Sequence, residues 1–120
     1  MDREEVRRYI QAKYGIEAET PWKEFPRYLV FRHPANRKWF ALLMNVPRER
    51  LGLEGEGELD VLDVKLAPML VHSLEGEEGF LVAYHMNKKN WLTVLLDGSA
   101  EEKRVKSLID DSFQITANER

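Results

Sequence analysis

Two pairs of apolar, β-rich runs, each joined by a loop of about five residues, constrain the fold of this chain most strongly. Residues 28–32 and 38–46 flank the first loop, and residues 80–85 and 91–96 flank the second. A parallel pair of strands needs a crossover connection of a dozen or more residues, so loops this short join antiparallel neighbours. The sequence therefore predicts two β-hairpins within one antiparallel sheet.

The N-terminal residues predict a helix over residues 3–14. Asp2 is a suitable N-cap, and Glu5 follows it at the spacing of a capping box. Apolar residues recur on one face of this segment at helical spacing, and Gly15 follows at the position where helices commonly end.

Three further elements complete the expected fold. Residues 59–64 form a fifth strand, and residues 66–74 form a short middle helix. Ser99 and Glu102 have the spacing of a capping box and predict the start of a last helix. We therefore expect residues 1–120 to form one α+β domain, a two-layer sandwich in which an antiparallel sheet of about five strands packs against N- and C-terminal helices.

The composition excludes several classes of site and of location. The chain has no cysteine, which rules out disulfides, thiolate metal sites and cysteine nucleophiles. No apolar run approaches the roughly 18 residues that span a bilayer, and the N-terminus does not resemble a secretory signal. We expect a cytoplasmic protein without membrane association, either a monomer or a weak homodimer.

The charge is unevenly distributed along the chain. The formal net charge is −3, yet residues 21–50 hold seven basic and two acidic residues. One interpretation is two solvated faces of different charge, and the other is a basic surface for an anionic partner. Positive charge clusters with polar or aromatic groups only around residues 32–38 and 85–91, which makes these two hairpin loops the candidate contacts.

The candidate nucleic-acid-binding residues belong to those two loops. Lysine and arginine would meet phosphates there, and histidine, asparagine or tryptophan could contact sugar or base. The alternative is a purely structural role, with solvated charges at one tip and a hydrogen-bonded corner at the other. The residues are Arg32, Arg37, Lys38, His85, Asn87, Lys88, Lys89 and Trp91.

Aromatic residues near the first hairpin suggest a second kind of interaction. Trp39 and Phe40 are consecutive in a strand, so one should face the core and the other should face outward. Some of Trp22, Phe25 and Trp39 should form an exposed apolar patch, which would suit a protein partner or a second copy of the chain.

No pattern for catalysis is present in the sequence. The three histidines, His33, His72 and His85, are far apart and lack metal-ligand spacing. There is no nucleophile elbow, P-loop or dinucleotide fingerprint. We therefore expect a binding protein rather than an enzyme, with no catalytic residues, no metal site and no cofactor.

The C-terminal half carries a motif that resembles the pattern of a known protein family. Residues 84–91 (YHMNKKNW) are followed by Thr93-Val94, by Leu96-Asp97-Gly98 and by Asp111-Ser112-Phe113. Upstream lie Asp63-Val64-Lys65-Leu66 with Pro68, and Arg37-Lys38-Trp39-Phe40-Ala41. This series resembles the MmcQ/YjbR family over essentially the whole chain. It departs from the family at Asn90, where histidine is common, and at Phe113, where tyrosine is common.

The resemblance implies a frataxin-like (CyaY-like) α+β fold. It also implies DNA binding through a double-wing arrangement of hairpins, which we expect to be weak and without sequence preference. Iron handling is not implied, because a shared fold does not carry a shared function. A protein-interaction module that uses an exposed sheet face or edge is the alternative function.

Overall fold

A computed structural model of the chain describes residues 1–119, and it contains one five-stranded antiparallel sheet. The strands lie in the order β1-β2-β3-β5-β4. Each strand pairs antiparallel with its neighbours, as the short hairpin loops predict. The strands are β1 (Leu29–Arg32), β2 (Trp39–Pro47), β3 (Glu58–Lys65), β4 (Phe80–Val82) and β5 (Trp91–Leu95).

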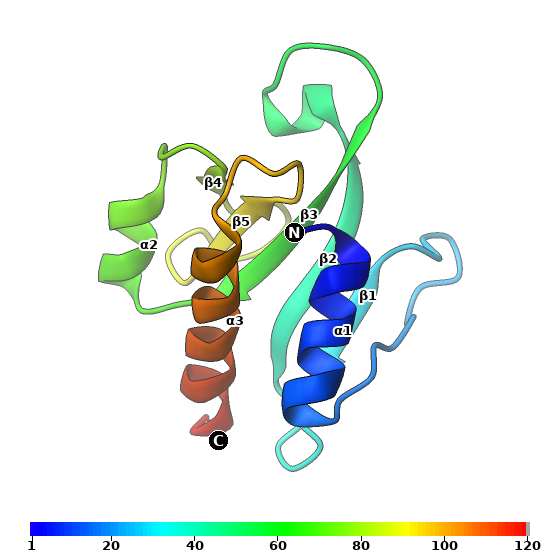
Figure 1. The fold of residues 1–120 in the computed structure, drawn as a ribbon, viewed down its shortest axis with the longest axis vertical. Helices are drawn as coiled ribbons and strands as arrows, with labels where there is room; N and C mark the ends of the chain where they lie inside the picture. Colours follow the sequence, from blue (N-terminus) through cyan, green and yellow to red (C-terminus); the bar gives the residue numbers. More distant parts are fainter. Residues whose placement is uncertain (120) are drawn as a thin grey trace.

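Two long helices, α1 (Arg3–Tyr14) and α3 (Glu102–Ala117), lie side by side over one face of this sheet (Figure 1). The short helix α2 (Pro68–Leu74) lies beside the sheet after β3, and a single 3-10 turn, η1 (Arg48–Leu51), follows β2. The predicted α+β fold, with terminal helices and a short middle helix, is therefore confirmed.

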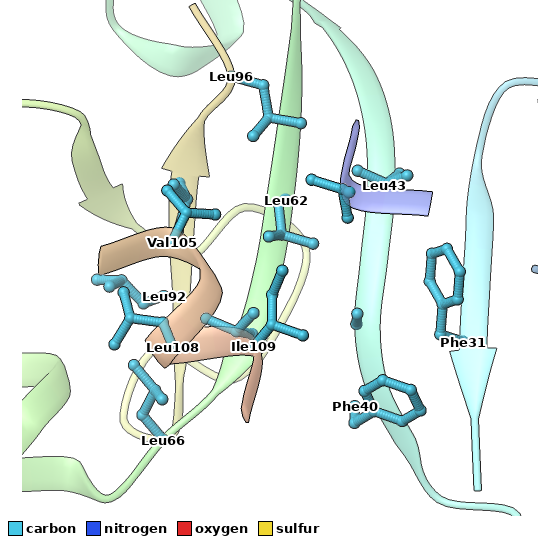
Figure 2. Packing of buried hydrophobic residues seen from close by; sticks show 14 of the residues in the cluster. Phe31, Phe40, Leu43, Leu62, Leu66, Leu92, Leu96, Val105, Leu108 and Ile109 are labelled. Atoms are coloured by element: carbon cyan, nitrogen blue, oxygen red, sulfur yellow. The ribbon is translucent and has the colours of Figure 1, made fainter. Parts of the chain in front are cut away.

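The main hydrophobic core fills the space between the sheet and these helices. Helix α1 contributes Val6 and Ile10, and α3 contributes Leu108 and Ile109. Figure 2 shows the α3 residues pointing toward Leu62 and Leu92 of the sheet. It also shows the rings of Phe31 and Phe40, which lie further along the same core. Phe40 is fully buried here, whereas its neighbour Trp39 lies on the opposite face of the sheet, which confirms the predicted alternation.

A polar clasp joins the two long helices. The carboxylate of Asp110 on α3 accepts hydrogen bonds from the Tyr9 and Tyr14 hydroxyls and from the Lys13 ammonium, all at 2.6–2.9 Å. Partial burial alone would raise the pKa of Asp110, but the bonds from Lys13, Tyr14 and Tyr9 outweigh it and the pKa is lowered. The clasp therefore fixes α1 against α3 through a charged carboxylate.

Several predicted element boundaries differ from the structure; the middle helix, for example, begins at Pro68 rather than at residue 66. Helix α3 begins at Glu102 and its N-cap position is Glu101, so Ser99 lies outside the cap, and its hydroxyl donates to the Asp97 carboxylate in a local turn. Strand β4 ends at Val82 rather than at residue 85, because the backbone N–H of Tyr84 donates to the Thr93 hydroxyl and leaves the ladder. The first helix is as predicted, including the reciprocal bonds between Asp2 and Glu5.

Within residues 1–119, every helix is too short or too polar to cross a membrane.

Candidate binding face

The sheet face opposite the helices, here called the helix-free face, is covered by loops rather than by secondary structure. Its buried residues are Val30, Leu42, Met44, Val46, Val61 and Leu95. Three segments lie over them: residues 19–28, the turn after β2, and the loop after β4. The first segment is held in place by a bridge between Glu19 and Val30.

An aromatic hollow of about 350 Å³ opens between these covering segments. The rings of Trp22 and Trp39 meet edge to face at 5.8 Å, and Trp22 meets Tyr28 in the same way at 6.1 Å. Phe25 stacks on Tyr28 at 4.7 Å and is 48% exposed. The floor is formed by Leu42 and Met44. Of the predicted exposed patch, Phe25 is exposed, whereas Trp22 and Trp39 are half-buried, and the three rings line a concavity.

Arg50 and His85 stand at the rim of this hollow. Both also line a second, adjoining hollow of about 570 Å³, beside Tyr84 and Lys88. Interaction with the Tyr84 hydroxyl raises the pKa of Arg50, so the guanidinium is cationic. Among residues 1–119, neither hollow is lined by a carboxylate. The electrostatics of the rim consequently favour an anionic ligand over a cationic one.

A buried carboxyl group lies beneath the helix-free face. The Asp63 side chain is fully buried, and its Oδ1 accepts a 2.6 Å hydrogen bond from the Thr93 hydroxyl while Oδ2 has no partner. Burial raises the pKa of Asp63 to about 8, although Thr93 and the charge of Lys88 act in the opposite direction. The carboxyl group is therefore neutral at pH 7 and stabilises the loop after β4 through Thr93.

The loop between β4 and β5, residues 83–90, is shaped by its own side chains. Asn87 accepts from the backbone N–H of Lys89 at 2.8 Å, and the Lys88 ammonium donates to the Ala83 carbonyl at 3.0 Å. The Trp91 ring is 7% exposed. These contacts give Asn87, Lys88 and Trp91 a structural role, although Asn87 and Lys88 are exposed, as are His85 and Lys89. His85 adopts a positive φ of 62° and lies 4.0 Å from the Tyr84 ring.

The loop between β1 and β2, residues 33–38, is partly committed to the end of α3. His33 is buried against Thr116 at 2.8 Å, and the Asn36 amide donates to the Thr116 and Glu119 carbonyls. Arg32, just before the loop, is ion-paired with Glu19. Arg37 is exposed and Lys38 is half-buried.

Both basic loops leave the sheet at the same end. The register pairs Arg32 with Trp39, and Lys65 at the end of β3 with Trp91 at the start of β5. Because β3 alone separates β2 from β5, the two loops start about 10 Å apart. The aromatic hollow adjoins the second loop at His85 and Met86 and reaches the start of β2 at Trp39.

The three histidines occupy separate environments in the described residues. In residues 1–119 no group of three histidine, aspartate or glutamate side chains is placed to hold a metal ion. His33 is engaged by Thr116, His72 is exposed on α2, and His85 stands at a rim without a carboxylate. A general acid–base pair would need such a partner within hydrogen-bonding reach.

The family model of YjbR matches residues 11–115. The chain belongs to the YjbR family. The uncharacterized protein YyaQ of Bacillus subtilis is 38% identical to this YjbR chain over 116 residues, which cover 97% of this chain and 98% of YyaQ.

Solved structures show the same fold. A crystal structure of a Pseudomonas syringae protein is 49% identical, with a TM-score of 0.94 over 97% of this chain and 99% of the other. Deinococcus radiodurans protein DR2400, whose domain is described as DUF419, is 20% identical and has a TM-score of 0.74 over 98% of this chain and 80% of the other. At that identity, the second likeness concerns the fold alone.

Three residues of this face escaped the sequence-based prediction: Tyr28, Arg50 and Asp63. Asp63 had a detectable signal, because it alternates with Leu59 and Val61 and therefore occupies an apolar-face position in its strand. Arg50 had none, since its place at the hollow depends on how the turn after β2 folds back.

Proposed function

We propose that this chain binds nucleic acid, without catalysis, through the helix-free face of its sheet. One observation carries the proposal: the two basic loops leave the same end of the sheet, and the aromatic hollow adjoins that end at Trp39 and His85. Cations along a groove combined with aromatic rings are the features with which proteins hold nucleic acid independently of sequence.

The number of available cations sets the expected strength of binding. In residues 1–119, the two basic loops and the rim of the hollow contribute four basic side chains that form neither an ion pair nor a hydrogen bond to a backbone carbonyl: Arg37, Lys38, Arg50 and Lys89. Arg32 is paired with Glu19, and Lys88 donates to a carbonyl. Four phosphate contacts give a log–log salt slope of about −3 for a single strand and about −3.6 for duplex DNA.

A charge reversal at the first loop tests the proposal. The double variant Arg37→Glu with Lys38→Glu should weaken the binding of labelled oligonucleotides of unrelated sequence to the same extent. It should also reduce the magnitude of the log–log salt slope by the share of about two phosphate contacts. The matched control is Arg8→Glu with Lys103→Glu, which makes the same change in net charge on the helical layer.

Fluorescence anisotropy at low salt provides the measurement, and circular dichroism checks the fold of each variant. We expect the control to lose much less affinity than the loop variant. Equal losses in the two variants, or no binding by the unmodified chain near 100 μM, the weak end of ordinary non-specific affinity, would overturn the proposal.

A protein partner is the second candidate, favoured by two exposed apolar side chains. Phe25 is 48% exposed, and Val82, at the end of the edge strand β4, is 49% exposed. An unpaired strand edge can accept another strand. Sedimentation equilibrium tests this for a second copy of the chain: self-association that Val82→Lys abolishes supports it, and a monomer at all concentrations argues against it.

A further inference from the structure

We infer that the aromatic hollow seats one unstacked nucleobase, so that the chain prefers single-stranded nucleic acid to duplex. The inference rests on the proposed function and adds the form of nucleic acid that the face selects. Its basis is the juxtaposition of four aromatic walls with a cationic rim on the helix-free face.

The hollow has the size and wall geometry for one planar ring. Its volume, about 350 Å³, lies at the lower end of the range for small-ligand pockets. Trp39 and Tyr28 both meet Trp22 nearly at right angles, at 83° and 87°. A flat ligand can therefore stack on one wall while its edge meets another, which are the two favoured aromatic arrangements.

The charge of the rim selects the ligand class. A cluster of aromatic rings can also form a cage for a quaternary ammonium group. Here the guanidinium of Arg50 stands at the opening, and no carboxylate lines the hollow within residues 1–119. A cation would be repelled, whereas a base that carries a phosphate would place its ring between the walls and its charge beside Arg50 and His85.

Duplex DNA cannot use the hollow in this way. Its bases are paired and stacked inside the helix, and a protein must pay for unstacking before it can enclose one. A duplex-reading protein usually inserts a helix or a ribbon into a groove. The helices α1 and α3 pack on the other face of the sheet, so neither is presented on this side (Figure 1).

The central variant is Phe25→Ala, because Phe25 is the most exposed wall and its loss threatens the fold least. Stacking on one aromatic ring changes affinity by roughly 5- to 150-fold. Met69→Ala is the matched control, since Met69 is an 87% exposed apolar residue on α2, away from the hollow. Arg50→Gln removes the rim charge without shortening the side chain greatly.

Four probes distinguish the contributions of the base, the phosphates and the strand to the affinity. They are a 12-nucleotide thymidine strand, an abasic strand with the same phosphates, a 12-base-pair duplex, and free thymidine monophosphate. We expect the thymidine strand to bind at least tenfold more tightly than the abasic strand and the duplex. Phe25→Ala should remove most of that difference, and Arg50→Gln should weaken both thymidine probes, while Met69→Ala should change nothing.

Failure of the inference and failure of the proposed function give different results. Equal affinities for thymidine strand, abasic strand and duplex, unchanged by Phe25→Ala, would overturn base seating and leave phosphate binding intact. No binding of any strand would overturn the proposed function as well. Tight binding of the monophosphate alone, with no gain from the strand, would reassign the hollow to free nucleotides and overturn the preference for a polymer.

Discussion

The substitution Asp63→Asn should change how the stability of this chain depends on pH. The Asp63 carboxyl group is fully buried, with one oxygen unpartnered, and its pKa is raised to about 8. An unfolded aspartate titrates near 3.9, so between these two values the folded chain holds one proton more than the unfolded chain. This contribution to stability is complete below about pH 4 and is lost as the pH rises to 8.

The magnitude follows from the same pKa. The free energy of unfolding falls by up to about 1.4 kcal/mol per pH unit, and between pH 6 and pH 8 it falls by about 2 kcal/mol. Asparagine is uncharged and can still accept the hydrogen bond from Thr93. The free energy of unfolding of Asp63→Asn should therefore lack this pH dependence. Relative to that of the unmodified chain, it should rise by about 2 kcal/mol from pH 6 to pH 8.

Urea unfolding at pH 6, 7 and 8, followed by tryptophan fluorescence, measures this difference. Asp111→Asn, at an exposed position on α3, is the control and should leave the pH dependence unchanged. If the free energies of unfolding of Asp63→Asn and the unmodified chain differ by a constant amount from pH 6 to pH 8, Asp63 is ionised in the folded state and the reasoning fails.

Three further substitutions test other contacts. Asp110→Ala removes the clasp between α1 and α3 and should cost about 1–3 kcal/mol above pH 5; because the pKa of this carboxylate is lowered, the loss should shrink as acid protonates Asp110 in the unmodified chain. Asn36→Ala frees the carbonyls at the end of α3 and should cost about 1–2 kcal/mol, with faster amide exchange in its last turn. Gly79→Ala should lower the free energy of unfolding, measured by urea denaturation, by about 2 kcal/mol or more, because the φ of Gly79 is +89° and the new Cβ would lie 2.8 Å from the Ala100 nitrogen.

The sequence predicted those parts of the fold that depend on local patterns. The capping box of Asp2 and Glu5 lies within one helical turn, and the short hairpin loops leave antiparallel pairing as the simple solution. Ser99 shows the limit of such signals. Its hydroxyl could accept from a backbone N–H at the start of a helix or donate to a nearby carboxylate, and in the structure it donates to Asp97.

The candidate site was less predictable because it depends on contacts between distant segments. The two basic loops were identified, but nothing local in Asn36 shows that its amide binds the end of α3, 80 residues later. The burial of Asp63 likewise requires segments that follow and precede it by tens of residues to fold over the sheet. The aromatic residues were expected on a surface, and their arrangement into a concavity became visible only in three dimensions.

The most direct test of nucleic-acid binding at the helix-free face uses the three tryptophans as reporters. Trp22 and Trp39 line the hollow, whereas the Trp91 ring is buried outside it and serves as an internal control. In a nitrogen-15 NMR titration with a 12-nucleotide thymidine strand, the indole resonances of Trp22 and Trp39 should shift saturably and that of Trp91 should stay in place. Unchanged indole resonances with the strand near 100 μM at low salt, or shifts confined to the helical layer, would contradict the account.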